Sequence, residues 1–247
     1  MTHLSAIVLA AGFGSRIADV TTDPKSLLRI KEKALMDWHF EALKASGIQN
    51  VVVVTGYKRE LLEEYLAKYK EDFQLQFAIN DDYRVKGNTY SLYYGLEKTP
   101  GAFLLFDADL IYDSIILTEF VRDEGPNQIL VGGASIDDIE CTKTMVDKEG
   151  AVRQFIDKRA VTVEEMNRLE FVGEALGILK FSKPYRDDML QACKNFLADE
   201  QNISKNWEHV MNPFLLSHHM TTHQAASDSW VEIDNKEDLE RAKTLFE

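Results

Sequence analysis

A short apolar run opens the chain and ends in a stretch of small residues that holds two glycines. The run spans residues 4–9, which is long enough for one buried strand, and Ala10, Ala11, Gly12 and Gly14 follow it. Because these side chains carry so little bulk, a ligand can lie directly against backbone N–H groups. A helix that begins just beyond the turn would add its positive N-terminal end. A turn of this kind suits a phosphate group.

Two cations follow the turn. Arg16 comes two residues after Gly14, and Lys25 stands directly after Pro24. Positive side chains beside a turn of amides suit a polyanion such as a nucleotide triphosphate. The turn is neither a dinucleotide fingerprint, because Ile17 replaces the required third glycine, nor a P-loop, because the Gly-Lys-Ser/Thr triplet is missing. An NAD-dependent oxidoreductase is therefore excluded.

Carboxylates stand at the ends of two predicted strands. Asp109 follows the predicted strand 103–106, and Glu232 and Asp234 belong to the predicted strand 230–234. Mg²⁺ prefers one or two carboxylates and takes water and phosphate oxygens for its other ligands. We predict that Asp109 and Asp234 bind Mg²⁺, with Glu232 as a further ligand because it points to the same side of the strand as Asp234. The alternative is a helix-capping aspartate and a solvated glutamate.

Apolar strand and helix patterns alternate in the first half of the chain. This alternation predicts an α/β fold with a Rossmann-like, mixed but mostly parallel sheet and helices on both faces. Ligands of such sheets bind at the carboxyl ends of the strands. The predicted strands are 4–9, 51–54, 73–79 and 103–106, and the predicted helices are 34–46, 60–70 and 89–96.

The second half has short strands separated by turns. Its predicted strands are 128–136, 144–147, 152–157, 174–181 and 230–234, and its predicted helices are 185–197, 207–218 and 236–245. We find no linker or repeat. We therefore predict one domain, 1–247, with a nucleotide-binding half (1–125) and a C-terminal half (126–247) that binds the acceptor.

Composition narrows the class of protein. A net charge of −13 argues against a nucleic-acid partner, since phosphate backbones are bound by basic faces. We find no signal peptide and no apolar stretch approaching the ~18 residues of a membrane helix. Cys141 and Cys193 are too few and too far apart for a disulfide framework, which predicts a reducing, cytoplasmic location.

The glycine turn with its cations resembles the signature loop of the nucleotidyltransferases that make NDP-sugars and CDP-alcohols. The pattern is Leu-Ala-Ala-Gly-x-Gly-x-Arg followed by Pro-Lys. Within that superfamily the chain is most similar to the bacterial phosphocholine cytidylyltransferases and the related small-phosphonate cytidylyltransferases. This narrower match rests on Asn80-Asp81, Asn88–Leu92, Asp107–Asp109, Glu232–Asp234 and Asp238-Leu239.

The resemblance implies the nucleotide-diphospho-sugar transferase type of fold and transfer of CMP from CTP with release of pyrophosphate. We expect Lys25 to stabilise the α-phosphate and Arg16 the leaving phosphates. The expected nucleotide contacts are Leu9, Ala10, Ala11, Gly12, Gly14, Asn80, Asn88, Ser91 and Asp107. Cytidine is implied by the resemblance, because residue spacing alone does not distinguish it from uridine or thymidine.

The acceptor is the least determined part of the prediction. Glu174 or Glu208 could meet an ammonium group, with Trp207 as a cation–π face. Arg153, Lys158 and Lys180 are candidates for its phosphonate. We favour a small aminoalkyl or hydroxyalkyl phosphonate, followed by phosphocholine. A sugar-1-phosphate nucleotidyltransferase using UTP, dTTP or GTP, a non-catalytic nucleotide-binding module and a homodimer remain open.

Overall fold

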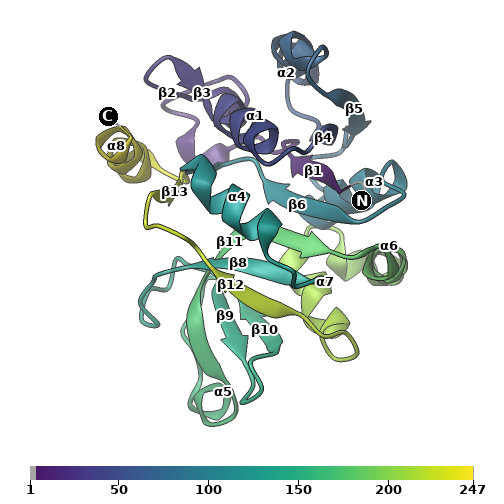
Figure 1. Ribbon diagram of the computed structural model, residues 1–247, viewed down its shortest axis with the longest axis vertical. Coiled ribbons are helices and arrows are strands. Elements are labelled where there is room, and N and C mark those ends of the chain that lie inside the picture. Colours follow the sequence, from purple (N-terminus) through teal and green to yellow (C-terminus); the bar gives the residue numbers. More distant parts are fainter. Residues whose placement is uncertain (1–3, 247) are drawn as a thin grey trace.

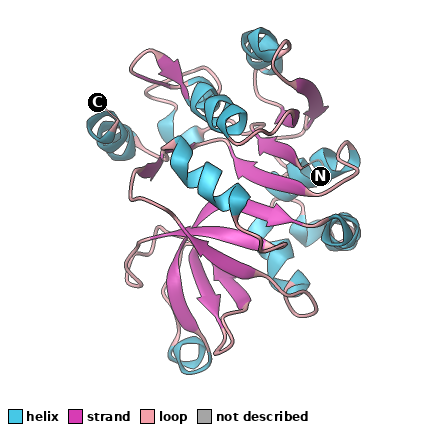
Figure 2. Cartoon of the chain, in the orientation of Figure 1, coloured by secondary structure: helices cyan, strands magenta, loops and turns pink. Residues whose placement is uncertain are grey.

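The computed structural model describes residues 4–246, which form a central nine-stranded sheet with helices on both faces (Figures 1 and 2). The main path of the sheet runs in the order β10-β9-β11-β6-β1-β4-β5, and β8 joins β11 to β12. The strands are β1 (Ser5–Leu9), β4 (Asn50–Thr55), β5 (Gln74–Ile79), β6 (Phe103–Asp107), β8 (Gln128–Gly132), β9 (Lys143–Val146), β10 (Val152–Ile156), β11 (Glu170–Phe181) and β12 (Thr221–Gln224).

The sheet has a parallel half and an antiparallel half. Strands β6, β1, β4 and β5 are parallel neighbours, so their carboxyl ends share one edge. The long strand β11 runs antiparallel to β6, β8 and β9 and leads into the lower part of Figure 1. The predicted mixed α/β class is confirmed, with the parallel pairing concentrated in the N-terminal half.

Helices cover both faces because the side chains of a buried strand alternate. In β1, Ile7 and Leu9 pack in one apolar cluster, whereas Ala6 and Val8 pack in another on the opposite face. The helices are α1 (Leu35–Ala45), α2 (Arg59–Leu66), α3 (Asn88–Glu97), α4 (Ser114–Arg122), α5 (Val163–Arg168), α6 (Lys183–Leu197), α7 (Trp207–Phe214) and α8 (Lys236–Leu245). Four 3₁₀ turns are η1 (Ser15–Ile17), η2 (Lys25–Leu27), η3 (Ala67–Tyr69) and η4 (Glu200–Asn202).

Two small sheets complete the fold, and one of them joins distant parts of the chain. The pair β2 (Arg29–Ile30) and β3 (Lys33–Ala34) is a local hairpin. The antiparallel pair β7 (Leu110–Tyr112) and β13 (Trp230–Glu232) sets Glu232 opposite Leu110. The acidic residues after β6 are thereby brought beside those near the C-terminus.

Some predicted boundaries differ from the structure. The helix predicted for 207–218 ends at Phe214, and the strand predicted for 230–234 ends at Glu232. Strand β12 has the polar sequence Thr-Thr-His-Gln and was not predicted, because no apolar alternation marks it. No helix within residues 4–246 has both the length and the apolar character needed to cross a membrane.

A buried carboxylate joins α1 to the segment α2–η3. Asp37 accepts hydrogen bonds from Ala34 N at 2.9 Å, Tyr65 Oη at 2.6 Å, Lys68 Nζ at 2.7 Å and Tyr69 Oη at 2.6 Å. Burial opposes the charge of Asp37, but these donors outweigh it and hold its pKa below the usual value. The charged form of Asp37 therefore stabilises the native packing of these helices.

We predict that Asp37→Asn lowers the free energy of unfolding at pH 7 by about 2 kcal/mol, the value of a hydrogen bond to a charged group. Because the pKa of Asp37 is depressed in the folded state, its contribution is complete above the unfolded pKa and is lost as the pH falls through the folded pKa. The penalty should thus shrink in acid. Urea titrations at several pH values test this, with the exposed Lys44→Met as a control that changes little. A penalty that does not depend on pH would contradict this role.

Candidate active site

The glycine turn follows β1 and precedes the two cations Arg16 and Lys25 in the chain. Gly14 has φ 65°, a left-handed conformation that favours glycine. A Cβ at this position would lie only 3.1 Å from the Cβ of Lys25, so the glycine also lets Lys25 approach the turn. Beyond the turn, Ser15–Ile17 forms only the short η1, and the first α-helix begins at Leu35. The turn thus offers backbone N–H groups and cations without a helix dipole.

A cleft of about 320 Å³ opens along this turn, and we call it the first cleft. It brings together every residue that the sequence predicted to contact nucleotide, and both predicted phosphate-binding cations. The lining includes Leu9, Ala10, Ala11, Gly12, Gly14, Arg16, Lys25, Asn80, Asn88, Ser91, Asp107, Asp109 and Asp234.

Polar side chains from β5 and α3 form the wall of the first cleft. Asn80 is 1% exposed, and its Nδ2 donates to Ser91 Oγ at 3.1 Å. Its Oδ1 is buried and has no hydrogen-bond partner within the described residues. Asn88 is the first residue of α3 rather than its cap, and its Oδ1 accepts from Trp207 N at 2.7 Å. Asn80 therefore keeps a free acceptor atom at this wall.

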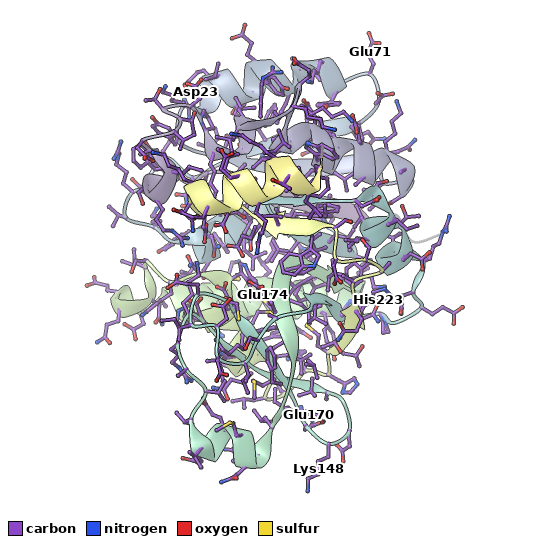
Figure 3. The ribbon with its side chains drawn as sticks, turned by 90° about the vertical axis from the view of Figure 1, so that its left-hand side faces the viewer. Asp23, Glu71, Lys148, Glu170, Glu174 and His223 are labelled. Carbon is purple, nitrogen blue, oxygen red and sulfur yellow. The ribbon has the colours of Figure 1, made fainter. Side chains whose placement is uncertain are left out.

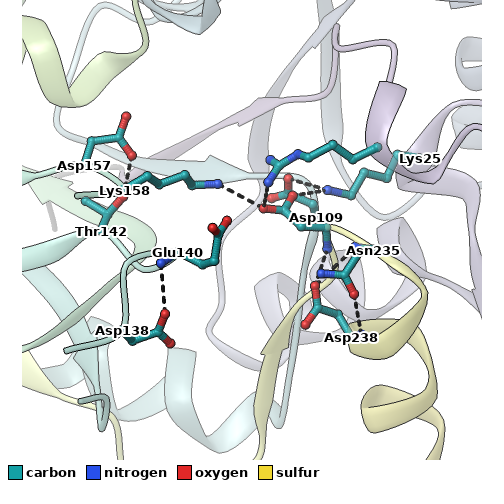
Figure 4. A network of polar contacts seen from close by, with 11 residues as sticks. Lys25, Asp109, Asp138, Glu140, Thr142, Asp157, Lys158, Asn235 and Asp238 are labelled. Atoms are coloured by element: carbon teal, nitrogen blue, oxygen red, sulfur yellow. Dashed lines mark hydrogen bonds and ion pairs between the residues drawn. The ribbon is translucent and has the colours of Figure 1, made fainter. Parts of the chain in front are cut away.

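Lys25 bridges two carboxylates that are far apart in the sequence (Figure 4). Its Nζ lies 3.0 Å from Asp109 Oδ2 and 2.8 Å from Asp234 Oδ1. The Lys25 and Asp234 side chains are each 13% exposed. Burial disfavours the charged form of Lys25, but the two carboxylates outweigh this effect and hold its pKa above the usual value. Lys25 therefore keeps its positive charge and faces the first cleft.

Two further cations contact the second carboxylate oxygen of Asp234, Oδ2. Arg16 Nη1 lies 2.7 Å and Lys158 Nζ 3.0 Å from Asp234 Oδ2. Burial alone would raise the pKa of Asp234, but these cations and Lys25 hold it well below the usual range. Asp238 supports this arrangement by accepting a hydrogen bond from Asp234 N at 3.0 Å at the start of α8.

Three carboxylates could hold a metal ion. Asp109, Glu232 and Asp234 each offer one oxygen, and these oxygens lie within 4.8 Å of one another. Burial, followed by the charges of Asp109 and Asp234, raises the pKa of Glu232 well above its usual value. Carboxylate oxygens in this number are the ligands that a hard divalent cation takes. The predicted acidic cluster is present, and a cation would relieve its mutual repulsion.

A second cleft of about 110 Å³ lies beside the first. Five residues line both clefts, namely Arg16, Asn88, Asp107, Asp109 and Asn206. The residues that line the second cleft alone are Leu110, Thr142, Asp157, Lys158, Ala175, Leu176, Gly177, Trp207, Glu208 and Glu232.

Three of the predicted acceptor residues, Trp207, Glu208 and Lys158, line the second cleft. Trp207 is 1% exposed, and its Nε1 donates to Asp107 Oδ2 at 2.8 Å. Burial, followed by the charge of Asp107, raises the pKa of Glu208 to about 8. Glu208 Oε2 is buried and has no hydrogen-bond partner within residues 4–246.

The other three predicted acceptor residues line neither cleft. Lys180 donates instead to Phe120 O at 3.1 Å and to Asp123 O at 2.9 Å, so it binds the end of α4. Arg153 pairs with Asp147 Oδ2 at 2.5 Å. Glu174, labelled in Figure 3, lies outside both clefts, and burial raises its pKa to about 7. The structure therefore corrects these three assignments, because local partners fix the two cations elsewhere.

Several side chains of the first cleft escaped the sequence analysis, and Tyr83 and Lys86 are the largest of them. Tyr83 and Lys86 line it from the segment between β5 and α3. Lys86 Nζ lies 2.7 Å from Asp82 Oδ2 and donates to Tyr94 Oη at 3.1 Å. A single lysine in a polar loop has no spacing that distinguishes it from other surface lysines, so no sequence signal could have identified it.

Comparisons with known proteins give matches over most of the chain. Residues 6–135 match the family model of the MobA-like NTP transferase domain. The CTP:phosphoglutamine cytidylyltransferase of Campylobacter jejuni is 26% identical over 258 residues, covering 96% of this chain and 98% of that protein. The choline-phosphate cytidylyltransferase of Streptococcus pneumoniae is 30% identical over 120 residues, covering 48% of this chain and 51% of that protein.

Solved structures share the whole architecture. The CTP:phosphocholine cytidylyltransferase from Streptococcus pneumoniae aligns with a TM-score of 0.77 at 20% identity, covering 99% of this chain and 100% of that one. A UDP-glucose pyrophosphorylase complexed with UDP-glucose aligns with a TM-score of 0.78 at 14% identity, covering 98% of each chain. The resemblance to nucleotidyltransferases and the predicted fold class are confirmed.

Position 177 in β11 requires a glycine, because the strand passes close to Asp107 at this point. It has φ 66°, and a Cβ there would lie 2.7 Å from Asp107 Oδ2, the atom that accepts from Trp207. We predict that Gly177→Ala lowers the free energy of unfolding by about 3 kcal/mol, through left-handed strain plus overpacking. Gly150→Ala is the matched control, because Gly150 has φ 79° with nothing within 4 Å, so it should cost only about 1 kcal/mol. Equal losses in chemical denaturation would contradict the close approach to Asp107.

Proposed function

The chain belongs to the family of MobA-like NTP transferase domains, and from this premise we propose that it is a Mg²⁺-dependent cytidylyltransferase. It would transfer CMP from CTP to a small phosphonate or a phosphorylated amino alcohol and release pyrophosphate. The observation that carries this proposal is the position of Lys25, which faces the first cleft from between Asp109 and Asp234. A fixed cation between carboxylates beside a glycine turn matches the needs of phosphoryl chemistry.

The first cleft would hold the nucleotide, with its triphosphate along the glycine turn. The choice of cytosine is supported by Asn80, whose Nδ2 is held by Ser91 while its Oδ1 stays buried without a partner. This acceptor atom suits the N4 amino group of cytosine, whereas uracil presents a carbonyl oxygen at the same position. A buried acceptor left unpaired costs free energy, so the site favours CTP over UTP.

The acidic cluster would hold Mg²⁺ through Asp109 and Asp234, with Glu232 beside them. The fit is supported by oxygens within 4.8 Å of one another and by the cations that now neutralise Asp234. When bound, Mg²⁺ supplies positive charge for the phosphate oxygens. Lys25 Nζ contacts the same carboxylates, so we infer that it leaves them when the site fills and turns to the α-phosphate.

The chain's own residues would do the remaining chemistry by positioning charge. An anionic oxygen of the acceptor attacks the α-phosphorus of CTP, the bond to the bridging oxygen breaks, and pyrophosphate leaves with its electron pair. Lys25 stabilises the charge on the α-phosphate, and Arg16 stabilises the leaving phosphates. No side-chain nucleophile is needed, because the acceptor is already an anion. Residues 1–125 would thus bind the nucleotide, and residues 126–247 the acceptor, within one domain.

We predict pyrophosphate release from CTP and Mg²⁺ only when a small phosphonate or a phosphorylated amino alcohol is present. The panel holds 2-aminoethylphosphonate, 2-hydroxyethylphosphonate, phosphocholine and hexose 1-phosphates, each with CTP, UTP, dTTP and GTP. Release only with a hexose 1-phosphate and another nucleotide would overturn the proposal in favour of a sugar-phosphate nucleotidyltransferase. No release with any pair would favour a non-catalytic nucleotide-binding module.

In the same assay Asp109→Asn should lower kcat by about a thousandfold, because a charge that acts in the transition state is lost. Its melting temperature should stay near that of the wild type, since Lys25 keeps its contact with Asp234 and the loss of the Lys25–Asp109 ion pair is offset by weaker repulsion among the three crowded carboxylates. The exposed Asp72→Asn, on the α1 side of the fold, serves as the control that keeps full turnover. A comparable loss of melting temperature would assign Asp109 a structural role instead.

Competition between Lys25 and the metal gives a prediction that does not depend on turnover. Lys25→Met should tighten Mn²⁺ binding about tenfold or more in the absence of nucleotide, because it removes a cation that holds the same oxygens. Asp234→Asn should weaken the binding. Electron paramagnetic resonance of free Mn²⁺ measures both, and Lys44→Met is the control. Unchanged or weaker Mn²⁺ binding by Lys25→Met would contradict the exchange.

A further inference from the structure

We propose that Glu208 in the second cleft binds the positively charged end of the acceptor, and that this end is a primary or secondary ammonium group rather than a trimethylammonium group. The inference rests on the proposed function, because it assumes that the acceptor occupies the second cleft. It goes further by naming the charge and the hydrogen-bonding character of the group that the chain selects.

Glu208 is the side chain of the second cleft that most clearly lacks a partner. The residue is 8% exposed and lines the cleft, yet its Oε2 has no hydrogen-bond partner among the described residues. A buried carboxylate is costly unless it is paired. A ligand group that donates hydrogen bonds and carries positive charge would supply the missing partner and favour the charged form of Glu208.

The position of Glu208 in its helix does not account for its burial. It lies in the first turn of α7, where a negative charge is favourable. That role is fulfilled equally well by an exposed glutamate, whose oxygens water would solvate. Sequence position thus explains an acidic residue here, whereas it does not explain a buried oxygen without a partner.

Charges of both signs line the second cleft. Lys158 and Arg16 line it, and both contact Asp234 Oδ2, so they stand toward the reacting phosphates. Glu208 supplies a carboxylate from α7 and Asp157 supplies one from just after β10, where Figure 4 shows it beside Lys158. A short zwitterion with a phosphonate at one end and an ammonium at the other complements a cleft that holds both cations and carboxylates.

Hydrogen bonding separates the two kinds of ammonium group. A primary ammonium has three N–H donors that can pair with Glu208 Oε2, whereas a trimethylammonium group has none. Quaternary ammonium groups are recognised by several aromatic faces. Among the described residues that line the second cleft, only Trp207 is aromatic. Its ring is 1% exposed, packs edge-on against Phe155 and donates Nε1–H to Asp107.

The size of the second cleft points the same way. Its volume of about 110 Å³, against about 320 Å³ for the first cleft, suits a short acceptor better than a hexose ring. Size and hydrogen bonding therefore favour the same acceptor class.

A matched series of acceptors tests the inference on the wild-type protein. It holds 2-aminoethylphosphonate, its N-methyl and N,N,N-trimethyl derivatives, and 2-hydroxyethylphosphonate, each assayed with CTP and Mg²⁺ for kcat/KM. We expect the primary and secondary amines to exceed both the trimethyl and the hydroxyl compounds by about 10- to 100-fold. Equal use of the amine and hydroxyl compounds, or a preference for the trimethyl compound, would overturn the inference.

Two isosteric variants assign the preference to a residue. Glu208→Gln keeps the volume of the side chain but removes its charge, so the ratio of kcat/KM for the amine to that for the hydroxyl compound should fall about tenfold or more. Turnover of 2-hydroxyethylphosphonate by this variant shows that it is folded. Glu174→Gln, on a half-buried glutamate outside both clefts, should keep the ratio. Loss of the ratio in Glu174→Gln instead would refute the role of Glu208.

Failure of the inference is distinguishable from failure of the proposed function. Pyrophosphate release with the hydroxyl or trimethyl compound but without a preference for the amine leaves the cytidylyltransferase intact and contradicts only the ammonium site. An absence of release with every acceptor in the series contradicts both. The wild-type comparison decides the matter even if Glu208→Gln does not fold.

Discussion

The ion pairs between Lys25 and the two aspartates Asp109 and Asp234 are the interaction on which the arrangement of the site depends. The aspartates come from positions 125 residues apart, and without a cation between them their charges would repel each other. Burying one lysine and two carboxylates is costly unless the geometry is good, and here both oxygens lie at hydrogen-bond distance. The pairing holds the end of the chain against the glycine turn and keeps the acidic cluster assembled.

The fold brings these residues together through β-sheet register. Strand β7 follows directly after Asp109, and β13 pairs with it antiparallel, so that Ile233 N donates to Asp109 O at 3.0 Å. A shift of one residue in this register would turn Glu232 away from the cleft and replace it with an apolar side chain. The helix α8 then caps the arrangement through Asp238. The two small strands therefore matter more for the site than their length suggests.

Local chemistry explains how much the sequence could predict. The glycine turn and Lys25 were identified from the small residues and the spacing of the cations, and Asp109 from its place after the carboxyl end of a parallel strand. Lys180 was misassigned because it donates to carbonyl oxygens at the end of α4. No sequence pattern indicates which backbone carbonyl groups a lysine will contact. Arg153 was misassigned because Asp147 lies across a hairpin turn.

The balance of charge explains why an acidic protein can bind polyanions. The chain carries a net charge of −13, so any attraction for a triphosphate must come from cations held close to the clefts. Lys25, Arg16 and Lys158 all contact Asp234, which keeps them in place but also neutralises them. Substrate phosphates can recruit these cations only if another positive charge replaces them at the carboxylates. The acidic cluster and Glu208 thus act as counter-charges, and a metal ion together with a cationic acceptor would complete the neutralisation that the chain alone leaves unfinished.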